Sequence, residues 1–143
     1  MQQLVVFSLG REEYSLPISQ VQEIIRYAEP RGIPNSYACV RGVINLRGKI
    51  VPVCDLAQLL GFAREADDET KIVIVESHAG IAGLIVDEVD EVLTVGPEQL
   101  EDPPSSQSRH IAAIAKVEDR LLILLDLDRV LADIGLGALE LAA

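Results

Sequence analysis

Residues 39–56 place the strongest constraint on the fold, because short runs of branched apolar residues alternate there with residues that form turns. The segment reads CVRGVINLRGKIVPVCDL. Val and Ile favour extended backbone, whereas Asn and Gly favour tight turns. The pattern therefore predicts a hairpin with strands at 39–44 and 49–53, joined by a turn over residues 45–48.

The glycines and the lysine of this segment also invite comparison with a loop that binds nucleotide phosphates. Such a loop places four residues between its first Gly and the Gly-Lys pair, followed by a Ser or Thr that binds magnesium. Here five residues separate Gly42 from Gly48, and Ile50 follows the lysine. Three of those five are bulky apolar residues, which resist the backbone conformations of a phosphate-binding nest. A nucleotide site of this kind is therefore excluded.

The rest of the chain continues this character of short extended runs between turns. Hydrophobic residues make up 49% of the chain and aromatic residues only 3%, so Val, Ile and Leu must form the core. Asp55 and Asp126 precede apolar helical patterns and are the expected N-caps of two short helices, the first of which ends at Gly61. Further strands are expected at 4–9, 14–16, 71–76, 81–86, 111–117 and 121–125.

Two other segments carry apolar residues at helical spacing. Residues 17–26 begin with Pro17 and a candidate N-cap at Ser19, and their apolar side chains would share one helical face. In residues 86–93 the apolar positions recur at the same spacing, beside acidic residues. The spacing favours a short helical segment at 17–26 and is helical in period at 86–93.

The two halves of the sequence resemble each other. ISQVQEII at 18–25 resembles VDEVDEVL at 86–93, at an offset of 68 residues. KIVPVCDLAQLLG at 49–61 resembles LLILLDLDRVLADIG at 121–135, at an offset of 71 residues. The alternative is chance similarity between short apolar patterns. Because a unit of about 70 residues is only marginally stable alone, the repeat predicts two small β-barrels packed together, with helices at their ends.

The charge of the chain argues against two classes of partner. Twelve basic and 23 acidic residues give a formal net charge of −11, which disfavours nucleic acid and an anionic membrane surface. No apolar run approaches the ~20 residues of a membrane span, and the N-terminus shows neither a basic leader nor a long apolar segment. We therefore expect a cytoplasmic protein without direct membrane insertion. Cys39 and Cys54 are expected to be buried, reduced thiols.

Signals of catalysis are scarce in this sequence, which lacks the common hydrolase, zinc-protease and calcium-loop motifs. His78 and His110 are isolated in turn-like sequence and are expected to be solvated surface residues. The acidic cluster at residues 87–91 is interpreted as a solvated face rather than a metal site, because neighbouring side chains point in different directions. No catalytic, cofactor-binding or metal-binding residue is predicted.

A mixed apolar and charged surface is the best candidate for function. Ile18, Val21 and Ile24 supply more apolar side chains than one short segment needs for anchoring. Glu23 and Arg47 are opposite charges that a two-barrel arrangement would bring close together. An apolar strip flanked by charges suits the helix of a partner protein. The alternative, in which these residues only form core and solvated surface, stays open at this point.

Three segments of the chain are similar to one known protein family. VRGVINLRGKIVPVCDLAQLLG at 40–61 resembles the signature hairpin of CheW-type chemotaxis coupling proteins, and VFSLGREEYSLPISQVQEI at 6–24 and GLIVDEVDEVL at 83–93 match it in order and spacing. The similarity extends from about residue 3 to about residue 134. It implies a mostly β fold of two intertwined SH3-like five-stranded β-barrels packed together, with short helices.

The resemblance further implies a single domain over residues 1–143, with an N-terminal half at about 1–66 and a C-terminal half at about 67–143. It implies a non-enzymatic adaptor, without cofactors, that bridges the cytoplasmic tip of a chemoreceptor (a methyl-accepting chemotaxis protein) to the regulatory domain of a CheA-type histidine kinase. The implied receptor-binding residues are Val5, Ile18, Val21, Glu23, Ile24, Arg47 and Val89, and the implied hairpin-shaping residues are Gly42, Asn45 and Gly48. Kinase contacts are not assigned to individual residues.

Two other interpretations of the sequence compete with the adaptor. The first is a regulatory domain excised from the histidine kinase itself, which has the same fold; the Met1 start and a chain that closes near residue 143 argue against it. The second is a barrel that senses a small ligand. Such a sensor needs a pocket with convergent polar groups, which the sequence does not indicate.

Overall fold

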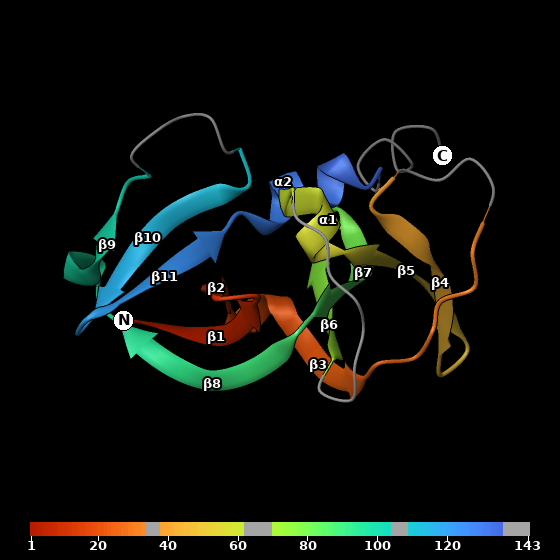
Figure 1. The fold of residues 1–143 in the computed structure, drawn as a ribbon, viewed down its shortest axis with the longest axis horizontal. Helices are drawn as coiled ribbons and strands as arrows, with labels where there is room; N and C mark the ends of the chain where they lie inside the picture. Colours follow the sequence, from red (N-terminus) through yellow and green to blue (C-terminus); the bar gives the residue numbers. More distant parts are fainter. Residues whose placement is uncertain (34–37, 62–69, 104–108, 136–143) are drawn as a thin grey trace.

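Two β-sheets lie side by side in the molecule, with two short helices at the seam between them (Figure 1). This computed structural model describes residues 1–33, 38–61, 70–103 and 109–135. The first half of the chain contributes β1 (Gln2–Leu9), β2 (Glu12–Pro17), η1 (Ile18–Gln20), β3 (Val21–Arg26), β4 (Val40–Leu46), β5 (Lys49–Asp55) and α1 (Leu56–Leu60). The second half contributes β6 (Lys71–Ser77), β7 (Gly80–Val86), β8 (Glu88–Val95), η2 (Pro97–Gln99), β9 (Leu100–Glu101), β10 (Ile111–Val117), β11 (Arg120–Leu125) and α2 (Leu127–Asp133).

Each sheet combines strands from both halves of the chain. The six-stranded sheet, here called sheet A, has the order β8-β1-β2-β11-β10-β9, and the five-stranded sheet B has the order β3-β6-β7-β5-β4. In sheet A the hairpin β1–β2 lies between strands of the second half, and in sheet B the hairpin β6–β7 lies between strands of the first half. The two barrels are thus intertwined and SH3-like, as the family resemblance implies, and β9 is an additional short strand of sheet A.

The internal repeat predicted from the sequence is confirmed by the strand order. Exchanging β1, β2, β3, β4 and β5 with their counterparts β6, β7, β8, β10 and β11 converts the order of sheet B into that of sheet A, apart from β9. Each sheet contains one parallel pair at the equivalent place, β5 with β7 and β11 with β2. The irregularities repeat as well, because the pairing skips Gln22 of β3 in one sheet and Asp90 of β8 in the other.

Strands β1 and β6 are buried on both faces because each separates two apolar cores. Ile72 of β6 faces the core of sheet B, whereas its neighbour Val73 faces a larger core shared by the two sheets. On β1, Leu4 faces the core of sheet A and Phe7 faces the shared core. Strands buried in this way read as continuous apolar runs rather than as alternating patterns. The shared core is what joins the two barrels.

The two short helices begin at the predicted aspartates. The Asp55 carboxylate accepts a hydrogen bond from the backbone N of Gln58 at 3.4 Å, and that of Asp126 accepts one from the backbone N of Arg129 at 3.2 Å. Gly61 follows α1 in the left-handed conformation, with φ of 101°, which is the usual C-terminal signal of a helix. Both N-cap predictions are confirmed, and both helices bury apolar side chains in the shared core.

The segments with helical spacing at 17–26 and 86–93 are mainly strands, so the helical interpretation is wrong. Only residues 18–20 form a 3-10 turn, η1, whose N-cap is Pro17 rather than the expected Ser19. Strand β3 alternates between half-buried and exposed residues and pairs with β6, while β8 pairs with β1. Pairing with strands that are distant in the sequence overrides a weak local pattern of helical period.

The hairpin predicted at 39–53 is confirmed, with a shorter turn than expected. Strand pairing begins at Leu46↔Lys49, so the loop consists of Arg47 and Gly48 alone. Their φ angles of 52° and 88° match a type I′ turn, the connection that suits the twist of two antiparallel strands. The Asn45 side chain accepts a hydrogen bond from the backbone N of Gly48 at 2.7 Å. This geometry places Arg47 at the tip of the hairpin.

A close approach of two backbone segments occurs at Gly42. A Cβ atom at this position would lie 2.1 Å from the carbonyl oxygen of Arg31. Arg31 and Val43 exchange two backbone hydrogen bonds of 2.9 Å each. This bridge joins the segment after β3 to β4, and β3 and β4 are the two edges of sheet B. Gly42 therefore permits the contact that closes sheet B into a barrel.

We expect Gly42→Ala to reduce the free energy of unfolding by about 3 kcal/mol or more, because the new methyl group collides with backbone rather than with a side chain that can move. Gly10→Ala is the matched control, since Gly10 also has positive φ (61°) but no atom lies within 4 Å of the place that the new methyl group would take. It should cost only about 1–2 kcal/mol of backbone strain. Denaturant unfolding followed by circular dichroism measures both; equal losses would contradict the assignment.

Candidate functional site: an ion pair and apolar residues on the barrel surface

An ion pair between Glu23 and Arg47 joins the two edges of sheet B. The Arg47 Nη1 atom donates to Glu23 Oε1 at 3.1 Å, and Nη2 donates to Oε2, which makes the contact bidentate. Glu23 lies on β3, and Arg47 lies in the β4–β5 turn. The prediction that these charges meet is confirmed. Both residues belong to sheet B, so they meet within one barrel.

The ion pair is open to solvent on the arginine side. The Arg47 side chain is 71% exposed and that of Glu23 is 28% exposed. The hydrogen bond from Arg47 lowers the pKa of Glu23 below its ordinary value, and the same contact raises the pKa of Arg47. A paired but exposed guanidinium can still offer donor groups to a partner's carboxylate or carbonyl oxygen.

The apolar residues implied to bind the receptor differ in their accessibility. Ile18 of η1 and Ile24 of β3 are each 41% exposed, although both are large hydrophobic residues. Val21 of β3 and Val89 of β8 are half-buried and pack against the shared core from equivalent positions of the repeat. Val5 is only 3% exposed. The structure thus offers Ile18 and Ile24 directly to a partner, Val21 and Val89 partly, and Val5 hardly at all.

Val92 is an exposed apolar residue that sequence reasoning missed. It is 49% exposed and pairs with the buried Val5 across the β1–β8 ladder. It also occupies the position in β8 that Ile24 occupies in β3, at the repeat offset of 68 residues. That offset is the signal that could have identified it. On sheet A, Val92 rather than Val5 is the side chain that a partner can reach.

Sheet A carries a second charged network around Glu91, the counterpart of Glu23. Arg120 at the start of β11 bonds Glu13 on β2 at 2.8 Å and Glu91 on β8 at 2.7 Å. Glu91 corresponds to Glu23 in the repeat. The hydrogen bond from Arg120 lowers the pKa of Glu13. Burial raises the pKa of Asp90, and the negative charges of Glu13 and Glu91 raise it further.

The acidic cluster at residues 87–91 is therefore more than the solvated face that the sequence suggests. Asp87 accepts a hydrogen bond from the backbone N of Gly10 at 2.6 Å, and Asp90 accepts one from the Ser8 hydroxyl at 2.6 Å. These contacts hold the start of β8 against β1 and the β1–β2 turn. In the part of the chain that the structure describes, no group of three His, Cys, Asp or Glu residues could hold a metal ion.

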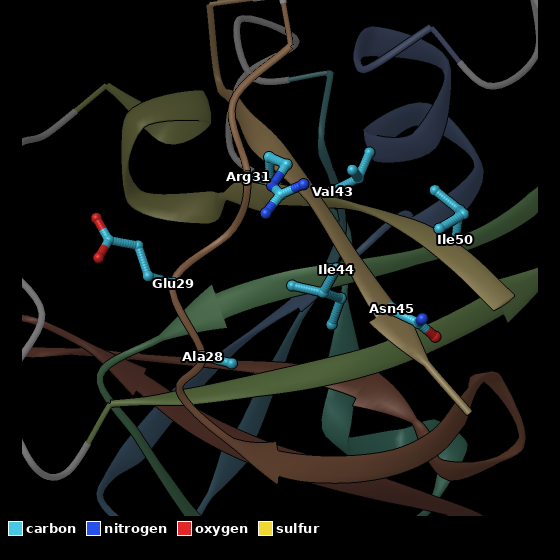
Figure 2. Close-up of a pocket in the computed structure, with 7 residues that line it drawn as sticks. All are labelled: Ala28, Glu29, Arg31, Val43, Ile44, Asn45 and Ile50. Atoms are coloured by element: carbon cyan, nitrogen blue, oxygen red, sulfur yellow. The ribbon is translucent and has the colours of Figure 1, made fainter. Parts of the chain in front are cut away.

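The β4–β5 and β10–β11 hairpins each expose one large apolar residue near the tip. Ile50 on β5 is 62% exposed and Leu121 on β11 is 60% exposed. The two positions are equivalent in the repeat. Ile50 borders an open cavity of about 500 Å³ (Figure 2), which is lined by Ala28, Glu29, Arg31, Val43, Ile44, Asn45 and Ile50. The side chains of Glu29 and Asn45 lie on opposite sides of this group (Figure 2), so these two polar groups do not converge.

The two histidines differ from each other. His78 is 82% exposed, which confirms the solvated position. His110 is only 14% exposed and its Nε2 atom lies 2.5 Å from the Asp133 carboxylate, so the solvated prediction is wrong for this residue. The sequence placed His110 in a turn, but α2 packs beside it and supplies Asp133. Cys39 and Cys54 are free and buried, as predicted.

The fold and this surface define a class of intertwined double-barrel domains, and comparisons with known proteins give the family. The CheW-like domain family matches residues 3–135. Chemotaxis protein CheW of Bacillus subtilis is 35% identical over 135 residues, which cover 91% of this chain and 86% of that protein. Chemotaxis protein CheW of Klebsiella aerogenes is 33% identical over 138 residues, with 92% and 82% covered.

A solved structure gives the same result. The crystal structure of scaffolding protein TtCheW from Thermoanaerobacter tengcongensis matches this fold with a TM-score of 0.82 at 38% sequence identity, over 88% of this chain and 84% of that one. The chain belongs to the CheW-like domain family. Within the described ranges, no helix is long and apolar enough to cross a membrane.

We expect Arg47→Asn to raise the pKa of Glu23 toward its ordinary value, because the hydrogen bond that lowers it is removed. Asn tolerates the left-handed backbone of this turn. Carbon NMR titration of the side-chain carboxyl groups measures the shift, and Glu13, which is held by Arg120 instead, is the internal control. Because the pKa of Glu23 is lowered in the folded protein, the pair stabilises the fold above the ordinary pKa, and this contribution disappears as pH falls through the lowered value.

If the Glu23 pKa stays low in the folded Arg47→Asn protein, the pair is not its cause.

Proposed function

We propose that this protein is a non-enzymatic adaptor of chemotaxis signalling, which couples the cytoplasmic tip of chemoreceptors to a CheA-type histidine kinase. Membership of the CheW-like family supports this proposal, as do relatives named chemotaxis protein CheW and a structural neighbour described as a scaffolding protein. The single observation that carries it is the exposed Glu23–Arg47 pair beside the exposed Ile18 and Ile24. Such an adaptor works in the cytoplasm, next to the receptors it binds.

The receptor surface is proposed to run from sheet B toward sheet A. Ile18 and Ile24 would contact apolar side chains of a helical partner, and Arg47 would contact its polar groups. Val21 and Val89 pack against the shared core from the two sheets, and we propose that they line the receptor surface between its sheet B and sheet A parts. The buried Val5 would support the β1–β8 pairing rather than touch the receptor. Its exposed partner Val92 would make the contact instead.

The kinase is proposed to bind at the tips of the β4–β5 and β10–β11 hairpins. The regulatory domain of such a kinase is expected to have the same double-barrel fold, so end-to-end packing of barrels is a natural contact. Ile50 and Leu121 are the large apolar residues exposed there, and their burial would contribute about 1–3 kcal/mol each. Leu121 lies on sheet A, in a different hairpin from Arg47, so a kinase contact through Leu121 would leave Glu23 and Arg47 open to the receptor.

The other interpretations receive less support. The relatives that match over 82–86% of their own length are chemotaxis proteins CheW, which favours the adaptor over a domain of the kinase. A small-ligand sensor would need convergent polar groups, and the cavity beside Ile50 is open with its polar side chains apart.

We expect Arg47→Glu to weaken binding of a receptor cytoplasmic fragment about tenfold or more, because two acids then face each other and the partner loses a cationic contact. The backbone should tolerate the change, since Glu118 occupies the equivalent turn with φ of 55°. Calorimetric titration measures the affinity. The double reversal Glu23→Arg with Arg47→Glu restores the pair itself and is the matched control.

Rescue by the double variant would mean that the receptor needs the intact pair, whereas continued weak binding would mean that it contacts Arg47 directly. Unchanged affinity in a folded Arg47→Glu protein would reject the assigned surface.

We expect Leu121→Asp and Ile50→Asp, made singly or combined, to prevent the kinase regulatory domain from joining a receptor–adaptor complex. In each case a charge would be buried at the barrel contact. Receptor binding by Leu121→Asp should remain, since Leu121 lies on sheet A, whereas Glu23 and Arg47 belong to sheet B. Ternary complexes are measured by sedimentation with receptor fragments, together with kinase autophosphorylation. If the wild-type protein forms no ternary complex, the adaptor function itself is rejected. If both variants still form the ternary complex, only the proposed hairpin-tip contact is rejected.

A further inference from the structure

Two free thiols lie close to each other at the base of the β4–β5 hairpin. Cys54 on β5 has no exposed surface, and Cys39, just before β4, is 6% exposed. The backbone N of Asp55 donates to the carbonyl oxygen of Cys39 at 2.8 Å, which fixes the two cysteine backbones beside each other. Both side chains belong to the shared core. Neither thiol is used by the adaptor surface described above.

The contact between the two thiols shifts their pKa values in opposite directions. It lowers the pKa of Cys39, although burial acts in the opposite direction. The same contact, together with burial, raises the pKa of Cys54. The contact thus favours ionisation of Cys39 over that of Cys54, although the charges of Asp133 and Asp55 act against it. Cys39 is also the more exposed of the two, so it is the one that a small reagent reaches.

We propose that Cys39 and Cys54 form an oxidation site for hydroperoxides, which closes to an intramolecular disulfide. The inference rests on adjacency and burial: two thiols already in contact need little backbone movement to bond. It goes beyond the adaptor function and does not depend on it.

The reaction balances with one hydroperoxide molecule. The Cys39 sulfur attacks the peroxide, the O–O bond breaks, and sulfenic acid and an alcohol (or water) form. The Cys54 sulfur then attacks the sulfenic sulfur, an S–S bond forms, the S–O bond breaks, and the leaving hydroxide takes the Cys54 proton as water. The two thiols lose two electrons, and the peroxide gains them. Thiol reductants reverse the bond by exchange.

The location suggests what the bond would restrain. It would tie the start of β4 to the end of β5, next to the ion pair in which Arg41 holds Asp55 at 2.6 Å. Asp55 also caps α1. The negative charge of Asp133 on α2 acts to raise the pKa of Cys39, so the site lies where the two halves of the chain meet. Oxidation would lock the base of the hairpin whose tip presents Arg47.

The test uses the whole protein, exposed to hydrogen peroxide and then denatured and alkylated. We expect both thiols to be lost to alkylation together, a mass decrease of two hydrogens, a linked Cys39–Cys54 peptide and a protein that stays monomeric on a non-reducing gel. Dithiothreitol should restore both thiols. Two alkylatable thiols after an exposure that fully oxidises free dithiothreitol would overturn the proposal, and so would disulfides between molecules only.

Two variants test the assigned roles. Cys54→Ala should leave Cys39 to accumulate as sulfenic acid, which dimedone traps, whereas Cys39→Ala should leave Cys54 unmodified under the same exposure. Trapping on Cys54 alone would reverse the assignment and overturn it. Circular dichroism establishes that each variant is folded. The wild-type measurement needs no substitution, so it decides the proposal even where a variant does not fold.

Discussion

Strand exchange between the two halves of the chain is the constraint on which the rest of the structure depends. Strand β3 leaves its own half to pair with β6, and β8 does the same with β1. Each sheet therefore exists only when both halves are present, and the shared core between β1 and β6 likewise takes residues from both halves. A repeat unit of about 70 residues would bury too little apolar surface alone. Exchange solves this by making each half part of the other's barrel.

The exchange also explains how the surface is arranged. Because the halves are equivalent, several exposed features of one sheet have counterparts on the other: Ile24 and Val92, Ile50 and Leu121, and the charged groups around Glu23 and Glu91. The counterparts are not identical. In sheet B a single exposed arginine holds one acid, whereas in sheet A the half-buried Arg120 holds two. A partner therefore meets two related surfaces that differ in available charge.

The sequence predicts most of what is local and little of what depends on distant pairing. The hairpin at 39–53 and the caps at Asp55 and Asp126 follow from nearby residues, and the barrel pair follows from the repeat and the family resemblance. The strands β3 and β8 are not predicted as strands, because their apolar spacing fits a helix and only the distant β6 and β1 decide otherwise. The prediction that His110 is solvated is wrong for the same reason, since its partner Asp133 lies on α2. Of the candidate site, the meeting of Glu23 and Arg47 is predictable, but the burial of Val5 is not.

Comparison of the two hairpins separates what the fold requires from what it leaves free. Gly42 is required, since any side chain there collides with the Arg31 backbone. Arg47 is not, because the equivalent turn adopts nearly the same φ with Glu118 in its place. Backbone geometry therefore does not explain the arginine. Its bond to Glu23 joins two sheet edges that the Arg31–Val43 bridge already joins, and a pair this exposed contributes little stability. What an arginine adds at that tip is a cationic group held in a fixed position and open to a partner.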